Sequence, residues 1–186
     1  HNVTKGLLDA FGAQRVIDSP LSECVIAGCG VGAAIAGMRP IVEIMYADFL
    51  PLAMDQIINN AAKTSYLTQG ADKVPLVIRS NFGTGKGQGP QHSQSPEGWL
   101  FNVPGLRIAI PTTPQDARGL LQSSIRDDNP VIFLEHKLLY ALKGEMDPDA
   151  PPIPLGKADI KRSGTDLTIV ATGLMVHKSL EAAKQL

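Results

Sequence analysis

The sequence has 186 residues, of which 44% are hydrophobic and 19% charged, and its formal net charge is -1. These values are ordinary for a soluble globular protein with one large domain, or with one domain and a piece of a second. A charge so near zero supplies no basic surface, so we expect neither nucleic acid nor an anionic membrane as a partner. No apolar run is long enough for a membrane span.

Two cysteines, Cys24 and Cys29, are present. Their spacing is not that of a zinc site, and no paired histidine motif accompanies them. We interpret both as small core residues that stay reduced.

Short β-rich runs alternate with longer helical patterns. In chain order they predict a helix over 3–11, a strand over 15–18, a helix over 22–36, a strand over 41–46, a helix over 54–68, a strand over 74–79, a glycine-rich loop over 81–91, a strand over 106–110, a helix over 113–126, a strand over 130–135, a strand over 166–172 and a helix over 176–186. Such alternation is typical of βαβ units and predicts an α/β fold, with a mostly parallel sheet and helices on both faces.

A change in composition predicts the domain organisation. Residues 144–154 hold four prolines and three acidic residues without periodicity, which indicates a linker over 144–155. We expect the main domain over 1–143 and the start of a second α/β domain over 156–186. The chain opens and stops inside helical patterns that lack caps, so we expect missing sequence at both ends.

Ligands of parallel α/β sheets bind at the carboxyl ends of the strands. The segments that follow the predicted strands are therefore the candidate site, and they are 18–23, 46–49, 80–92 and 135–140.

One candidate motif is Gly28 to Ala33, which fits the GxGxxA pattern of a dinucleotide-binding turn. Glu43 or Asp48 would then bind the ribose. The alternative is a helix in which small residues allow close packing, and the pattern alone does not separate the two. The first alternative predicts a dinucleotide-binding oxidoreductase domain.

Two further candidates lie close together. Alternate glycines over Gly83–Gly89 predict a loop whose backbone approaches something closely, although they do not match a phosphate-binding Walker motif. His92 follows this loop between polar neighbours, which favours a substrate contact or a proton carrier over a merely solvated histidine.

Glu23 is the fourth candidate. It begins a predicted helix, where a carboxylate commonly favours the helix dipole. The neighbouring residues are apolar, and apolar surroundings would raise the pKa of a carboxyl and let it carry a proton near neutral pH.

Several segments in a fixed order resemble one family. Arg15–Glu23 (RVIDSPLSE) is similar to its RxxDTPxxE signature, and four more segments follow in family order. These are 40–63, 90–96 (PQHSQSP), 104–118 and 129–140 (NPVIFLEHKLLY). The family is the beta subunit of the thiamine pyrophosphate-dependent decarboxylating component of 2-oxo acid dehydrogenase complexes, with acetoin dehydrogenase among its members.

The resemblance implies a transketolase-like pyrimidine-binding domain. It also implies a thiamine pyrophosphate site shared with an alpha subunit that holds the diphosphate and magnesium, in an alpha-beta heterotetramer. The enzyme would carry out oxidative decarboxylation and transfer the acyl unit to lipoamide on an acyltransferase core. Acetoin cleavage is the alternative activity, and a subunit without catalysis is a third. The location implied is the bacterial cytoplasm, or the mitochondrial matrix in a eukaryote.

The resemblance also assigns residues. Glu23 matches the catalytic glutamate that hydrogen-bonds the aminopyrimidine ring, Phe49 the aromatic that stacks on it, and His92 the histidine on the substrate side. Leu52 occupies a place where some relatives have Gln, so it receives no polar role. Some relatives bind potassium, and the matching residues here are Leu76, Ser124, Asp127 and Asn129.

Overall fold

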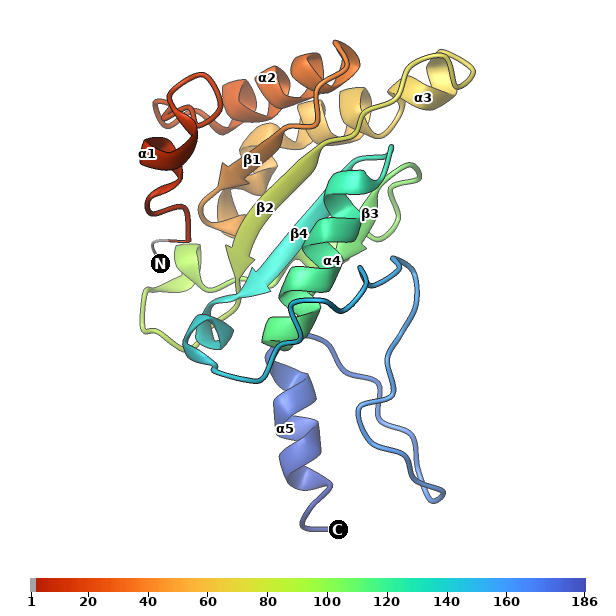
Figure 1. Cartoon of the computed structure of the whole chain (residues 1–186). Coiled ribbons are helices and arrows are strands. Elements are labelled where there is room, and N and C mark those ends of the chain that lie inside the picture. Colours follow the sequence, from red (N-terminus) through yellow and green to blue (C-terminus); the bar gives the residue numbers. More distant parts are fainter. Residues whose placement is uncertain (1–2) are drawn as a thin grey trace.

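The computed structural model describes residues 3–186, which form a single four-stranded sheet (Figure 1). Its strands are β1 (Ile41–Ile44), β2 (Val77–Phe82), β3 (Arg107–Ala109) and β4 (Val131–His136). They lie in the order β1-β2-β4-β3, and every pair is parallel. The predicted α/β fold with a parallel sheet is confirmed.

Each face of the sheet is covered by helices, because the central strands carry apolar side chains in both directions. Ile78, Ile132 and Leu134 point into the larger core, beneath α2 (Glu23–Ile35), η1 (Ala47–Ala53) and η2 (Asp55–Ala61). On the opposite face Val77, Val131 and Phe133 pack against α4 (Pro114–Arg126), which crosses the front of the sheet in Figure 1. The remaining elements are α1 (Leu7–Phe11), α3 (Thr64–Leu67), η3 (Pro90–His92), η4 (Pro96–Trp99), η5 (Lys137–Ala141) and α5 (Leu174–Ala182).

Two predicted strands are wrong. Residues 15–18 and 166–172 form no strand. Ile17 is 78% exposed and Val170 91% exposed, and neither segment has a neighbouring strand with which to form a hydrogen-bonded ladder. A β-branched run without such a partner does not form a strand on its own.

Other boundaries shift by a few residues. The first helix begins only at Leu7, because Gly6 adopts a left-handed conformation with φ 85°. The predicted helix over 54–68 is divided into the π-helix η2 and the short α3. Strand β2 continues to Phe82 and includes the first residues of the predicted loop.

The predicted linker is packed rather than free. Arg118 donates to the carbonyl of Ala150 (2.9 Å), and the backbone N–H of Ile153 donates to the carbonyl of Gly119 (3.2 Å). Leu155 packs against the α4 side of the core. Beyond it, α5 reaches the main domain through His177, whose Nε2 lies 2.6 Å from the carbonyl oxygen of Thr112.

Cys24 and Cys29 are both free, as expected, but both are exposed, so the prediction that they are core residues is wrong. Among the helices of residues 3–186, none has the length and apolar character that a membrane crossing requires.

Candidate active site

An aromatic cluster lies beyond the carboxyl ends of β1 and β2. It consists of Tyr46 and Phe49, which follow β1, and His92, which ends η3. The imidazole of His92 stands edge-on to both rings, with centroids 5.0 Å from Tyr46 and 5.4 Å from Phe49. Two residues to which the resemblance assigned roles, Phe49 and His92, are thus in contact, whereas Tyr46 lies in a predicted candidate segment, 46–49, but had been assigned no role.

The short helix η1 positions Phe49. Its residues Ala47, Leu50 and Ala53 are fully buried, which leaves Phe49 half-buried at the edge of the core. Asp48 is also buried, and its Oδ1 accepts a hydrogen bond of 3.0 Å from the backbone N–H of Gln94. This bond ties η1 to the segment that carries His92.

The glycine loop (residues 83–89) makes the close approach that its sequence predicts. Gly83, Gly85, Gly87 and Gly89 all have positive φ, which side chains other than glycine rarely adopt. A β-carbon on Gly83 would lie 2.3 Å from Nε2 of His136, and one on Gly85 would lie 2.6 Å from Leu138. The loop backbone therefore rests directly on residues 136–138, at the end of β4 and the start of η5.

Lys137 lies in that segment and is 1% exposed. Its Nζ donates to the carbonyl of His92 and to Oε1 of Gln88 (3.2 Å), and it lies 4.9 Å from the centroid of the Tyr46 ring. The sequence placed Lys137 in a candidate segment, 135–140, but nothing in it distinguished this lysine from a solvated one.

Glu23 is the first residue of α2 and is half-buried. No hydrogen bond, ion pair or ring contact within residues 3–186 involves its side chain, and none joins it to Phe49 or His92. Its helix packs against η1, which carries Phe49. The predicted apolar neighbours are present, but Leu21 is 89% and Val25 58% exposed, so this chain alone does not enclose the carboxyl.

The dinucleotide interpretation of Gly28 to Ala33 is wrong. A dinucleotide fingerprint needs a strand, a tight turn and a helix, and here residues 23–35 form one continuous helix. Gly30 instead allows close packing, because a β-carbon there would lie 2.8 Å from Val42 and 3.0 Å from Leu76.

The residues predicted to bind potassium lie at the opposite, amino-terminal edge of the sheet. Asp127 is the C-cap residue directly after α4. Its Oδ1 accepts two hydrogen bonds of 2.8 Å from Asn129, and its Oδ2 pairs with Arg107 at 3.1 Å. The guanidinium of Arg39 donates to the carbonyls of Ile125 (3.1 Å) and Asp127 (3.0 Å).

The other two residues of that set are engaged as well. The carbonyl of Leu76 accepts from Val131 (2.8 Å), and the buried hydroxyl of Ser124 donates to the carbonyl of Leu120 (2.7 Å). Of the predicted set, the carbonyl of Asp127 thus already accepts a hydrogen bond from the Arg39 guanidinium. Among residues 3–186, no group of three or more His, Cys, Asp and Glu side chains could hold a metal ion.

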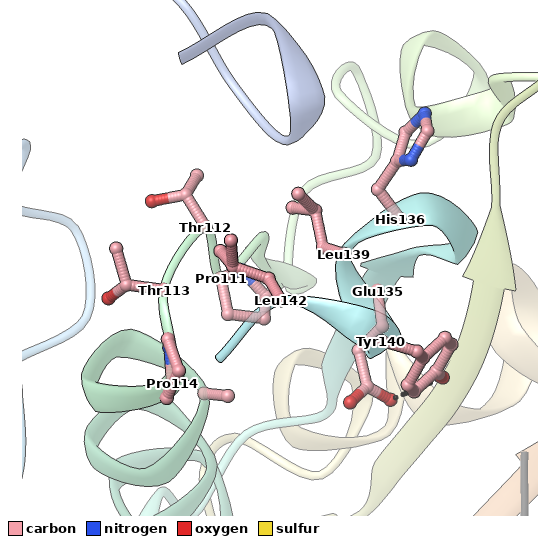
Figure 2. A pocket seen from close by; sticks show the side chains of 10 residues that line it. Pro111, Thr112, Thr113, Pro114, Glu135, His136, Leu139, Tyr140 and Leu142 are labelled. Carbon is pink, nitrogen blue, oxygen red and sulfur yellow. Dashed lines mark hydrogen bonds between the residues drawn. The ribbon is translucent and has the colours of Figure 1, made fainter. Parts of the chain in front are cut away.

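A hollow of about 190 Å³ lies on the α4 side of the sheet, between the ends of β3 and β4. Figure 2 shows Glu135 and Tyr140 in its wall, where the hydroxyl of Tyr140 lies 3.3 Å from Oε2 of Glu135. Arg79 donates to the same oxygen at 2.5 Å and pairs with Glu43 at 3.5 Å. Burial raises the pKa of Glu135, and Arg79 opposes this rise without cancelling it. Burial likewise raises the pKa of Tyr140.

Comparisons with known proteins identify the fold and its relatives. The model of the family described as "Transketolase, pyrimidine binding domain" matches residues 1–143, and that of "Transketolase, C-terminal domain" matches residues 156–186. One solved structure, a "Split gene transketolase, inactive beta4 tetramer", has a TM-score of 0.77 at 22% identity and covers 98% of this chain and 58% of its own. At that identity the likeness concerns the fold.

Three curated relatives are more similar in sequence. The chain is 49% identical over 184 residues to the 2-oxoisovalerate dehydrogenase subunit beta of Bacillus subtilis (strain 168), which covers 98% of this chain and 56% of the relative. It is 47% identical to the acetoin:2,6-dichlorophenolindophenol oxidoreductase subunit beta of the same organism, covering 99% and 54%. It is 45% identical to the mitochondrial pyruvate dehydrogenase E1 component subunit beta-1 of Arabidopsis thaliana, covering 100% and 52%.

The chain thus spans about half the length of the curated relatives it matches. The pyrimidine-binding family model, by contrast, matches residues 1–143, which is well over half of this chain. The chain also forms a four-stranded parallel sheet in the order β1-β2-β4-β3, with helices on both faces. This chain belongs to the transketolase pyrimidine-binding domain family, and within it resembles the beta subunits of 2-oxo acid and acetoin dehydrogenases.

Proposed function

We propose that this chain is part of the beta subunit of a thiamine pyrophosphate-dependent 2-oxo acid dehydrogenase. The observation that carries the proposal is the contact between Phe49 and His92 at the carboxyl edge of the sheet, beside the helix that begins at Glu23. The subunit names of its relatives support the same role, and they imply an alpha subunit as partner.

The residues at this edge fit an aminopyrimidine ring. Phe49 offers a half-buried aromatic face on which a flat heteroaromatic ring can stack. Within residues 3–186 the side chain of Glu23 has no hydrogen-bond or ion-pair partner, and the buried Oδ2 of Asp48 also lacks one. When bound, thiamine pyrophosphate supplies a nucleophilic carbon that adds to the carbonyl carbon of the substrate.

In this proposal each residue has a separate task. The carboxyl of Glu23 donates a hydrogen bond to a nitrogen of the aminopyrimidine ring and so holds a proton at that nitrogen. Phe49 orients the ring. The imidazole of His92, fixed between Tyr46 and Phe49, faces the substrate and exchanges a proton with it during acyl transfer.

The alpha subunit would complete the site. Leu21 and Val25 flank Glu23 and are exposed, so a second surface is needed to exclude water from its carboxyl. We place the diphosphate and magnesium on that subunit, in an alpha-beta heterotetramer whose product passes to a lipoyl-bearing acyltransferase core. Residues 1–143 would form the pyrimidine-binding domain, 144–155 its connection, and 156–186 the start of the C-terminal domain. The enzyme would work in the bacterial cytoplasm or the mitochondrial matrix.

Acetoin cleavage is the second candidate activity. The acetoin relative of Bacillus subtilis is 47% identical to this chain and that of Cupriavidus necator 49%, as similar as the 2-oxo acid enzymes. Product formation from pyruvate, branched-chain 2-oxo acids and acetoin by the reconstituted alpha-beta enzyme separates these activities.

The cofactor assignment is tested by titrating thiamine pyrophosphate against the full-length beta subunit, with and without its alpha subunit. We expect tight binding only in the assembled enzyme. Glu23→Gln should abolish activity there, while Glu181→Gln, at an exposed position of α5, should leave it unchanged. Tight binding by the beta subunit alone, or full activity of Glu23→Gln, would contradict the proposal.

Potassium at Leu76, Ser124, Asp127 and Asn129 stays a prediction. Binding would require Arg39 to leave the carbonyls of Ile125 and Asp127. Thermal unfolding of the assembled enzyme in matched concentrations of potassium and sodium chloride tests it, since only a specific site gives a higher melting temperature in potassium.

A further inference from the structure

We propose that Lys137 is a positioning residue that fixes the glycine loop and thereby the imidazole of His92. Three consecutive residues, His136, Lys137 and Leu138, hold the loop at different points and are called the latch below. The inference rests on the proposed function only where it concerns His92 in catalysis; the anchoring of the loop stands independently of it.

The first half of the loop is held by shape. Gly83 lies against the ring of His136 and Gly85 against the side chain of Leu138, each closer than any β-carbon would allow. The ring of His136 is itself fixed by an edge-on contact with Phe82, with centroids 5.2 Å apart. These contacts seat the loop on the latch before it turns toward His92.

The second half of the glycine loop is held by hydrogen bonds from the charged side chain of Lys137. Lys137 is buried and forms no ion pair within residues 3–186; its Nζ donates instead to the His92 carbonyl and the Gln88 side chain. Gln88 in turn contacts Tyr46, because its Nε2 donates to the hydroxyl of Tyr46 at 3.3 Å. A buried ammonium forms strong hydrogen bonds to such neutral acceptors, and loss of the ammonium would remove the donor that joins both of them to the latch.

Lys137, Gln88, Tyr46 and His92 therefore form one closed set of contacts. The Nζ of Lys137 lies over the ring of Tyr46, and the edge of that ring meets the imidazole of His92. Moving Lys137 would release both the backbone and one ring neighbour of His92. The imidazole would then lose the fixed orientation that proton exchange with a substrate requires.

Opening of the loop can be measured by proteolysis, because Lys86 is exposed at the centre of the loop and trypsin cleaves after lysine. In the assembled enzyme, Lys137→Met should speed cleavage after Lys86 by about tenfold or more, since the loop opens more often when its charged anchor is removed. Lys143→Met, at an exposed position beyond η5, is the matched control and should leave the rate unchanged. Cleavage after Lys157, outside the latch, should not change in either variant.

The kinetic result is a fall in kcat of roughly tenfold in Lys137→Met. The substrate KM should stay within about twofold of its original value, because Lys137 acts on the orientation of His92 and not on substrate binding. Lys137→Arg, which keeps the positive charge, should recover part of the kcat. If the wild-type enzyme has no activity on any candidate substrate, the proposed function fails, while the cleavage rates still decide whether the latch exists.

Equal cleavage after Lys86 in Lys137→Met and wild type would overturn the inference, and so would an unchanged kcat. Acceleration at Lys157 together with Lys86 would show that Lys137 supports the whole fold instead of the loop. If Lys137→Met does not assemble, Gln88→Ala decides. It removes one acceptor at an exposed position and should speed cleavage after Lys86 by roughly threefold, whereas no acceleration would overturn the proposal.

Discussion

Gly30 of α2 packs directly against Val42 of strand β1. A β-carbon on the glycine would lie 2.8 Å from a methyl group of Val42. Both Gly30 and Leu76, the next nearest neighbour, are buried, so little room exists for either side to move. The contact sets the distance between α2 and the sheet, and with it the position of Glu23 at the start of the helix.

Gly30→Ala should therefore destabilise the protein by about 1–3 kcal/mol through overpacking. Gly32→Ala, in the same helix, meets nothing within 4 Å and should be neutral or stabilise by up to about 1 kcal/mol, because alanine favours a helix over glycine. Urea unfolding of both variants of the full-length subunit measures the difference. A similar loss in both would mean that contacts of α2 with another subunit, and not the approach to Val42, determine the effect.

Phe49→Ala should weaken thiamine pyrophosphate binding by the assembled enzyme by roughly tenfold, because a stacked ring loses its aromatic partner. Phe101→Ala removes a phenyl ring that is 67% exposed and should leave the affinity unchanged. Isothermal titration of both variants compares them directly. Equal affinities would remove Phe49 from the proposed site.

Arg79→Met should cost about 3–5 kcal/mol, because it leaves the buried carboxylate of Glu135 without its cation. The side chains of this pair are only 7% and 16% exposed. Lys73→Met breaks the ion pair between Lys73 and Asp128, whose side chains are 60% and 40% exposed, and should cost far less because solvent screens this pair. Denaturant unfolding of the two variants gives the comparison, and a small loss in Arg79→Met would show that Glu135 takes up a proton or finds another partner.

Asp116 predicts a dependence of stability on pH. Burial raises its pKa, but hydrogen bonds from Thr112 and Lys161 lower it by more, so its folded-state pKa lies below the ordinary value. Its carboxylate accepts from the hydroxyl of Thr112 at 2.5 Å and pairs with Lys161 at 3.0 Å. A depressed pKa stabilises the folded state above the unfolded pKa of about 3.9, and this stabilisation is lost as pH falls through the folded value.

Asp116→Asn should accordingly lower the free energy of unfolding by about 1–2 kcal/mol at pH 7 and by clearly less near pH 3. The helix cap of α4, which Asp116 shares with Thr113, contributes to the loss at neutral pH. Unfolding curves at both pH values provide the measurement. The same loss at both would mean that the ionisation of Asp116 has no part in stability.

The central strands were predictable because they are buried on both faces. A continuous apolar run such as Val131–Leu134 is typical of a central strand in a parallel sheet, where the side chains are buried on both faces. Similar β-rich runs led to wrong strand predictions over 15–18 and 166–172. A strand also needs a neighbouring strand with which to form hydrogen bonds, and the residues of the segment itself do not reveal whether one is present. Gly28 to Ala33 left two interpretations open, because small residues serve close helix packing as well as a phosphate-binding turn, and the continuous helix α2 agrees with the first of them.

The candidate site was only partly accessible from sequence. Local spacing left Glu23 as an ordinary helix-start carboxylate, and the roles of Glu23, Phe49 and His92 came from the resemblance to a family. The burial of Lys137 was not foreseeable, because its partners Tyr46, Gln88 and His92 come from segments far from it in the sequence. Such a contact exists only once the sheet has brought the ends of β1, β2 and β4 together.

The packing of residues 150–155 along α4 decides where this chain can be shortened. A chain that ended at residue 143 would strip Ile153 from Gly119 and Leu155 from the apolar cluster of Val77, Val131 and Phe133. The uncovered side of α4 would then offer an apolar strip to neighbouring molecules, which favours aggregation. A cut after residue 155 keeps that cover in place, so the useful end of this folding unit lies at residue 155 and not at Ala141, where η5 ends.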